Sequence, residues 1–215
     1  MIRSLPNNNL SLAQADSRIT KKLAETILNF IGKIPITTKR KARDPSVAVR
    51  ALIRTAAAKA ALTSGSLALP PGPLGLLTLV PDLIAVWKIQ AQLVADIAAT
   101  YGKDAYLTRE QMLYCLFRHL ASQIVRDLVV RVGERVLIRS ASIQLLQTIA
   151  QKIGMSVAKK VIGKSISRWI PIAGAVGVGA YAYFDTGQVA ATAIKLFERE
   201  IDIGPQHDDK EITPA

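Results

Sequence analysis

Residues 69–104 read LPPGPLGLLTLVPDLIAVWKIQAQLVADIAATYGKD, and this segment constrains the architecture more than any other. Its first prolines fix φ and lack a backbone N–H, so residues 69–75 are predicted to be non-helical. The apolar run that follows predicts a long helix from about Asp82 to Tyr101, with Gly102 as its C-terminal stop. Asp82 is the expected N-cap, because its carboxylate can accept from the free N–H groups of the first turn.

Helical patterns also fill the chain on both sides of this segment. Asp44-Pro45 has the form of a cap followed by a first turn, and Thr108 opens a capping box with Gln111. Helices are predicted over residues 19–34, 45–62, 82–101, 108–154, 157–169 and 172–200. We therefore predict an all-α fold, a single helical bundle of about seven or eight helices.

Two apolar segments rich in Pro or Gly interrupt the helical pattern, at residues 67–80 and 169–184. Each precedes an acid, Asp82 or Asp185, that can cap the next helix. We expect the two segments to form hairpins that pack together through Gly and Ala contacts at one apolar end of the bundle. The chain then divides into an N-terminal amphipathic helix with a basic connector, a helical domain and a disordered tail, over residues 1–45, 46–203 and 204–215.

Residues 127–139, DLVVRVGERVLIR, are open to two interpretations. Their β-branched residues flank Gly133-Glu134, which suits the two-residue turn of a β-hairpin. A helix would instead place Arg131, Arg135 and Arg139 on one stripe, four residues apart. Because helical signals lie on both sides, we favour the helix and keep the hairpin as the alternative.

The chain combines a strongly basic charge with an apolar composition. Its 215 residues include 28 Lys and Arg against 16 Asp and Glu, so the net charge is +12, and half of the residues are apolar. The bases are concentrated in residues 1–60 and 111–168, which carry net charges of +9 and +8. This composition excludes a disordered chain, and the single cysteine, Cys115, excludes an internal disulfide framework.

Two segments are candidates for membrane spans, and neither meets the requirement. Residues 67–99 contain several prolines and charged side chains, and residues 169–184 are uncharged for only 16 positions. A spanning helix needs about 20 predominantly apolar residues. The first residues have no continuous apolar core, so we expect no secretory signal. We expect both segments to be buried in the bundle, with shallow insertion into a membrane as the alternative.

The run from Leu69 to Asp104 resembles the signature of the EcsC family of bacterial proteins, and residues 170–179 with Asp185 are similar to the second Gly-rich hairpin of that family. The first resemblance is carried by the Pro/Gly bend, Pro81-Asp82-Leu83, Trp87, Gln90, Ala95, Ala98 and Tyr101-Gly102. Over roughly residues 46–197 it implies a helical, bacterial, cytoplasm-facing protein from a family without an agreed activity. The family's name comes from a gene beside an ABC transporter, which hints at membranes.

The candidate pocket or motif residues are Asp82, Trp87, Gln90, Tyr101 and Asp185. Gln90 stands out because it lies among apolar residues, away from the polar stripe of its helix. A buried amide must find hydrogen-bond partners or it costs about 1–3 kcal/mol. We expect a neighbouring backbone to satisfy Gln90; the functional alternative is a polar anchor for a lipid head group in an apolar pocket.

Some sequence patterns suggest catalysis or cofactor binding, but the residues around them do not fit the structural setting that these motifs require. Residues 158–165 match a loose phosphate loop, but helix-like sequence precedes them and no acid follows to hold magnesium. Cys115 and His119 share a helical face without two further zinc ligands, so we interpret His119 as a core residue. The small residues Ala173 and Gly177, and Ala175 and Gly179, are expected to allow close helix packing. We expect no catalytic residue, no metal and no cofactor, and hence a protein that is not an enzyme.

The basic clusters point to an anionic partner. We expect a membrane-associated or lipid-binding protein, peripheral on the cytoplasmic face of a bacterial membrane, because Lys and Arg accompany apolar helices here. The alternatives are an adaptor for a membrane transporter or secretion complex and, less favoured because stacking aromatics are few, a nucleic-acid-binding protein. The oligomeric state is left open. The candidate lipid-binding residues are Arg131, Arg135, Arg139, Lys152, Lys159, Lys160, Lys164 and Arg168.

Overall fold

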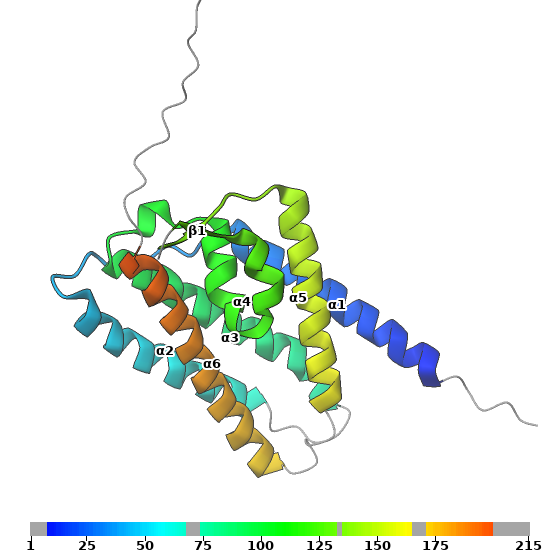
Figure 1. Cartoon of the computed structure of the whole chain (residues 1–215). Helices are drawn as coiled ribbons and strands as arrows, with labels where there is room; N and C mark the ends of the chain where they lie inside the picture. The colour runs from blue at the N-terminus through cyan, green and yellow to red at the C-terminus, as the bar shows by residue number, and fades with distance from the viewer. Residues whose placement is uncertain (1–7, 68–73, 133–134, 165–170, 200–215) are drawn as a thin grey trace, which may run out of the picture.

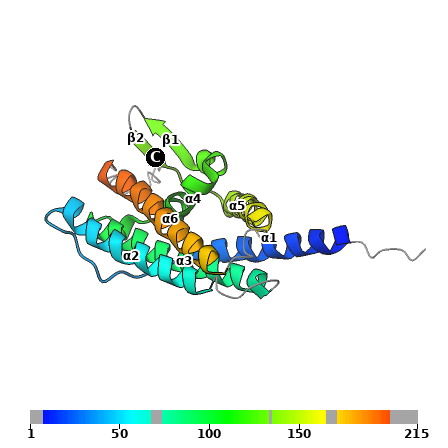
Figure 2. The same ribbon diagram turned by 90° about the horizontal axis from the view of Figure 1, so that it is seen from below.

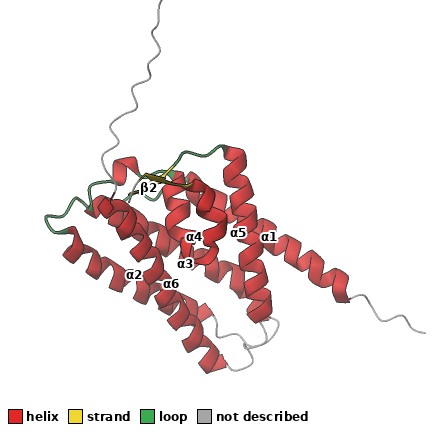
Figure 3. Cartoon of the chain, in the orientation of Figure 1, coloured by secondary structure: helices red, strands yellow, loops and turns green. Residues whose placement is uncertain are grey.

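The computed structural model describes residues 8–67, 74–132, 135–164 and 171–199 (Figure 1). These residues form six α-helices and one two-stranded hairpin (Figure 3). The elements are α1 Asn8–Gly32, α2 Pro45–Leu67, α3 Leu74–Thr100, α4 Arg109–Val125, β1 Val129–Val132, β2 Arg135–Ile138, α5 Ile143–Lys164 and α6 Pro171–Arg199. The helical class is confirmed, whereas seven or eight helices was too many for this part of the chain. The tail expected to be disordered lies outside the described residues.

Helix α3 lies at the centre of the bundle. It contacts α1, α2, α4 and α6, whereas α5 packs along α1 and against α4. Seen from below, α2 and α6 lie together on one side of the molecule, and α5 lies beside α1 on the other (Figure 2). The fully buried Trp87 of α3 meets Phe117 of α4 edge to face, with ring centroids 5.1 Å apart. These large rings form the middle of one continuous core.

Three local signals in the sequence are confirmed. Oδ1 of Asp44 accepts a hydrogen bond from the backbone N–H of Val47 at 3.2 Å, which caps α2. Thr108 and Gln111 form the capping box of α4, with both reciprocal hydrogen bonds present. Gly102 follows α3 with a φ of 73°, a left-handed conformation that glycine adopts without a steric penalty.

The predicted start of α3 was wrong. The helix begins at Leu74 instead of Asp82, and Pro81 lies inside it. Asp82 is therefore not an N-cap but a buried residue of a continuous helix. Pro81 lacks an N–H and therefore removes only one hydrogen bond from the helix. The other backbone groups of residues 74–80 gain helical hydrogen bonds when the helix extends over them. The preceding residues 68–73, where we predicted a bend, lie outside the described residues.

The second expected hairpin is also a continuous helix where it is described. Helix α6 begins at Pro171 and passes through Asp185, so Asp185 does not cap a helix either. A proline at the first position of a helix loses no hydrogen bond, which explains why the helix begins there. Gly177 is exposed and a Cβ at this position would meet nothing within 4 Å, so its expected role in close packing was wrong, whereas Gly179 is buried.

Residues 129–138 form a hairpin, so the favoured helix over 127–139 was wrong and the alternative is confirmed. β1 and β2 pair antiparallel, with Arg131 opposite Val136 and Val132 opposite Arg135. Side chains alternate along a strand, so positions 131 and 135 belong to opposite faces of the hairpin instead of one helical stripe. The β-branched valines favour a strand, and the partly buried ends at Val129 and Ile138 pack against the core.

Helix α5 runs without a break through Gly154, where we had predicted an end. Gly154 lies where α1 and α5 approach closely: a Cβ there would lie 2.9 Å from the carbonyl oxygen of Thr20 and 3.3 Å from the N of Ala24. Both of these are backbone atoms of α1, which cannot move aside as a flexible side chain can. The glycine therefore permits helix packing instead of ending the helix.

We predict that Gly154→Ala lowers the free energy of unfolding by about 1–3 kcal/mol, because α1 must shift away from the new methyl group. The matched control is Gly187→Ala in α6, where a Cβ meets nothing within 4 Å. That control should be neutral or stabilise the protein by about 0.5–1 kcal/mol through helix propensity. Urea unfolding followed by circular dichroism measures both, and equal effects of the two substitutions would contradict the packing argument.

Candidate functional site

A buried group of polar side chains joins the three helices α3, α4 and α6. Nε2 of Gln90, on α3, donates to Oδ2 of Asp185 on α6 at 2.7 Å and to Oγ1 of Thr186 at 3.3 Å. The second carboxylate oxygen of Asp185 lies 2.6 Å from Nε2 of His119 on α4. Oγ1 of Thr186 in turn donates to the backbone carbonyl of Ala182 at 2.8 Å. We refer to Gln90, His119, Asp185 and Thr186 as the polar cluster.

The helical repeat explains why these side chains meet. Asp185 lies on the face of α6 that also carries the buried Ala182 and Val189, so a carboxylate takes a core position. Gln90 occupies an equivalent position on α3 between the buried Trp87 and Val94. A charged group inside an apolar core is stable only when it is paired and hydrogen-bonded, and the polar cluster supplies both conditions for Asp185.

Two contacts hold the carboxyl group of Asp185. Gln90 donates an N–H to one oxygen, and Nε2 of His119 forms a hydrogen bond with the other, in a direction set by the tautomer of the imidazole ring. Among the described residues, Nδ1 of His119 and Oε1 of Gln90 have no hydrogen-bond partner, and both atoms are sealed from solvent. A proton relay to a substrate needs an accessible nitrogen. In this structure the cluster therefore acts as an internal connection between helices.

A second buried acid joins α2 to α3. Oγ of Ser64 donates to Oδ2 of Asp82 at 2.9 Å, and both residues are buried. Asp82 lies two turns before Gln90 on α3. Asp82 and Asp185, the acids that follow the two predicted hairpins, thus connect neighbouring helices instead of capping the start of a helix.

The five candidate motif residues are only partly brought together. Gln90 and Asp185 are in contact, whereas Tyr101 lies beyond the end of α3, near Asp44 and Glu198. Burial raises the pKa of the Tyr101 hydroxyl, and the negative charges of Glu198 and Asp44 raise it further. This tyrosine is therefore a neutral residue at one end of the bundle, away from the polar cluster.

Tyr181 borders the polar cluster on α6, one turn before Asp185. Partial burial raises the pKa of its hydroxyl, and the charge of Asp185 adds to the effect. The hydroxyl accordingly stays protonated at neutral pH. Tyr181 thus presents a neutral, amphipathic side chain next to a buried charge.

The candidate lipid-binding residues are distributed over three parts of the fold. Lys152 and Lys159 are exposed on α5, and Arg139 is exposed just after β2. The side chains of Arg131 and Arg135 in the hairpin, and of Lys160, Lys164 and Arg168, lie outside the described residues. Residues 158–164 of the loose phosphate-loop match are helical, so their backbone N–H groups do not form a phosphate cradle.

Sequence reasoning missed the partners in both buried contacts. It named His119 only as a core residue, did not single out Thr186, and did not connect Ser64 with Asp82. One signal was available, because Asp185 falls on the apolar stripe of its own helix and must have a partner. The identity of that partner is not encoded locally, since Gln90 and Asp185 are 95 residues apart. No group of three His, Cys, Asp or Glu side chains among the described residues is arranged to hold a metal ion.

The chain matches the model of the EcsC protein family over residues 3–200. It belongs to the EcsC family. The matched range contains the six helices and the hairpin that the described residues of this EcsC chain form. It starts well before residue 46, where the resemblance in the sequence begins. No curated protein and no solved structure matches it.

One described segment of the EcsC chain, Pro81–Thr100 in α3, is long and apolar enough to cross a membrane by length and composition. In its most apolar window 61% is buried inside the structure. The core helix of a bundle has the same composition, and the central position of α3 among four other helices fits that explanation.

We predict that Asp185→Ala lowers the free energy of unfolding of this EcsC protein by about 3 kcal/mol, because His119 and Gln90 stay buried without their acceptor. Gln188→Ala, an exposed position on the same helix, should change it by less than about 0.5 kcal/mol. In a double-mutant cycle Gln90→Leu should cost less in the Asp185→Ala background than alone. Urea unfolding tests both statements, and additive costs would show that the side chains do not act together.

Proposed function

We propose that this EcsC protein is a non-enzymatic peripheral protein that binds anionic lipid at the cytoplasmic face of a bacterial membrane. The observation that carries the proposal is the charge of α2 and α5. The bases of α2 are two Arg and one Lys, those of α5 are all Lys, and neither helix contains Asp or Glu. Arg54 and Lys59 on α2, and Lys152 and Lys159 on α5, are exposed.

One base of each helix lies in the half that runs toward one end of the bundle. Helices α2 and α5 both finish where α3 and α6 begin, at the lower end in Figure 1. Lys59 and Lys159 lie in the second halves of their helices, which run toward this end. A flat anionic surface that meets the lower end would therefore approach bases of both helices.

The energies are sufficient for reversible attachment. Each Lys or Arg near an anionic leaflet contributes about 1 kcal/mol, and this attraction falls off within a Debye length of about 8–10 Å. Three or four such residues account for binding that depends on salt. A nucleic-acid-binding protein would also use bases, but stacking aromatics do not accompany them on α2 or α5.

The proposal locates the lipid on the surface and not around Gln90. Gln90 is fully buried, and it donates to the side chains of Asp185 and Thr186. The expectation that a neighbouring backbone satisfies this amide nitrogen was therefore wrong. Its amide nitrogen is thus already engaged within the polar cluster. Surface attachment needs no rearrangement of this contact, whereas a lipid anchored at Gln90 would have to displace it.

We predict that the protein floats with vesicles of phosphatidylcholine and phosphatidylglycerol at low salt, and that high salt releases it. Lys59→Glu combined with Lys159→Glu should weaken the apparent affinity at least about tenfold, because two attractions are lost and two repulsions replace them. The measurement is vesicle flotation over a range of lipid concentrations, repeated with a DNA competitor.

The matched control is Arg40→Glu combined with Lys195→Glu, which makes the same change in net charge at exposed positions outside α2 and α5. The control should lose much less affinity. Equal losses in the two variants would show that only net charge matters. Failure of the wild-type protein to float would overturn the proposal and favour the adaptor, and release by DNA alone would favour nucleic acid.

A further inference from the structure

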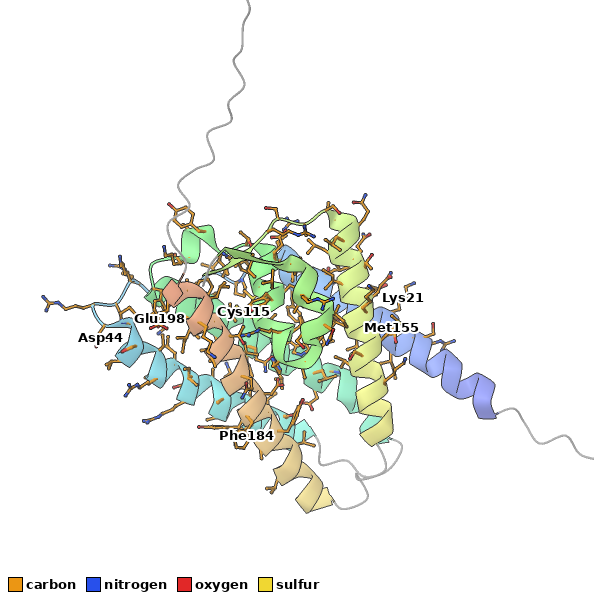
Figure 4. All side chains as sticks on the ribbon, in the orientation of Figure 1. Lys21, Asp44, Cys115, Met155, Phe184 and Glu198 are labelled. Carbon is orange, nitrogen blue, oxygen red and sulfur yellow. The ribbon has the colours of Figure 1, made fainter. Side chains whose placement is uncertain are left out.

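The first half of α6 exposes a face of large apolar side chains. Val176 is 69% exposed and Phe184 is 73% exposed, and Tyr181 and Tyr183 are 53% and 44% exposed. Tyr183 and Phe184 contact each other edge to face, with ring centroids 6.4 Å apart. Figure 4 shows Phe184 at the surface of the lower half of α6, well away from Cys115 in the core. We refer to Val176, Tyr181, Tyr183 and Phe184 as the aromatic face.

The aromatic face contains no charge and has a fixed orientation. No Asp, Glu, Lys or Arg occurs from Pro171 to Phe184. The opposite side of α6 is buried at Ala182 and Asp185, and the polar cluster holds Asp185 in place. The helix therefore cannot turn to hide these side chains without breaking a buried contact. A patch of this kind on a surface marks a site of interaction.

Helix α2 continues this surface and adds positive charge. It packs along α6, and Ala60 meets Ala182 and Val86 in a small buried cluster between α2, α6 and α3. Near the end of α2, Leu62 is 76% exposed, and the exposed Lys59 precedes it by three residues. The apolar patch is thus bordered by a helix that has bases and no acids.

We propose that the aromatic face, together with Leu62, enters the headgroup layer of an anionic lipid bilayer. This inference rests on the proposed function and specifies which side of the protein meets the membrane. Tyr and Phe suit the boundary between headgroups and acyl chains, because their rings are apolar while the tyrosine hydroxyl can remain hydrated. Lys59, on the neighbouring helix α2 and three residues before Leu62, adds attraction to anionic headgroups.

Charge complementarity selects a lipid surface over a second copy of this chain. A symmetric dimer through this face would bring α2 of one copy close to the same region of the other. Three bases on α2, Arg50, Arg54 and Lys59, are exposed, and no acid on that helix is available to pair with them. Like charges facing each other oppose such a dimer, whereas an anionic bilayer attracts the bases of this helix.

The test places an environment-sensitive fluorophore on the aromatic face. Phe184→Cys is labelled with a nitrobenzoxadiazole dye. The matched control is Lys195→Cys, at an exposed position about three turns further along the same helix. The native Cys115 is fully buried and stays unlabelled in the folded protein. Each labelled protein is mixed with phosphatidylcholine–phosphatidylglycerol vesicles with and without a lipid carrying a nitroxide near the top of its acyl chain, and flotation is scored on the same samples.

Insertion predicts a blue shift, an intensity gain of about twofold or more and nitroxide quenching for the dye at 184, and none of these for the dye at 195. Flotation without a change at 184 would overturn the aromatic face while leaving the proposed function intact. Absence of flotation would overturn both. A blue shift at 184 that rises with protein concentration without vesicles would identify a second copy as the occupant and also overturn the inference.

An independent variant keeps the native cysteine pattern. Phe184→Ser combined with Val176→Ser removes apolar surface without changing charge, and both side chains are largely exposed, so the fold should be retained. We expect the apparent affinity for the anionic vesicles to fall about tenfold or more, since each lost side chain contributes apolar area to insertion. Unchanged affinity in a variant with an unaltered circular dichroism spectrum would contradict the inference.

Discussion

The arrangement of the helices depends on the buried carboxylate of Asp185. A charged group in an apolar core destabilises the fold unless each of its oxygens is paired. Here one oxygen is bound to His119 of α4 and the other to Gln90 of α3. A rotation of α6 by one residue, about 100°, would remove the carboxylate from both partners. The pairing therefore allows one orientation of α6 against two neighbours, a specificity that apolar contacts alone enforce less strictly.

A similar but weaker constraint operates on another side of α3. Oγ1 of Thr37 and Nε2 of Gln92 both donate to the half-buried Asp96, at 2.7 and 2.9 Å, and Nε2 of Gln92 also reaches the carbonyl of Ile36. These contacts hold the connector between α1 and α2 along the central helix. The polar groups of α3 thus determine which segments lie against it, while Trp87 and its apolar neighbours supply most of the burial.

The sequence predicted those features whose causes lie within a few residues. The caps at Asp44 and Thr108 and the stop at Gly102 need only local hydrogen bonds or a local φ, so their patterns were sufficient. Features that depend on distant partners were not predictable in this way. In residues 129–138 the local propensity allows either a helix or a hairpin, and the hairpin packs its two ends on the core. Asp82 connects two helices through Ser64, and Asp185 connects three through Gln90 and His119, so both roles depend on residues from other helices.

Helix α6 has two faces whose properties are coupled. Its buried face carries the hydrogen-bonded Asp185, and its outer face carries the uncharged aromatic residues that precede it. Because the polar cluster fixes the rotation of the helix, the aromatic face is already ordered before any partner arrives. Binding to the proposed lipid surface then requires no folding of this segment, and little conformational entropy is lost on attachment. A rigid face of moderate area beside a few bases gives attachment that is reversible and sensitive to salt, in contrast to the permanent insertion of a membrane-spanning helix.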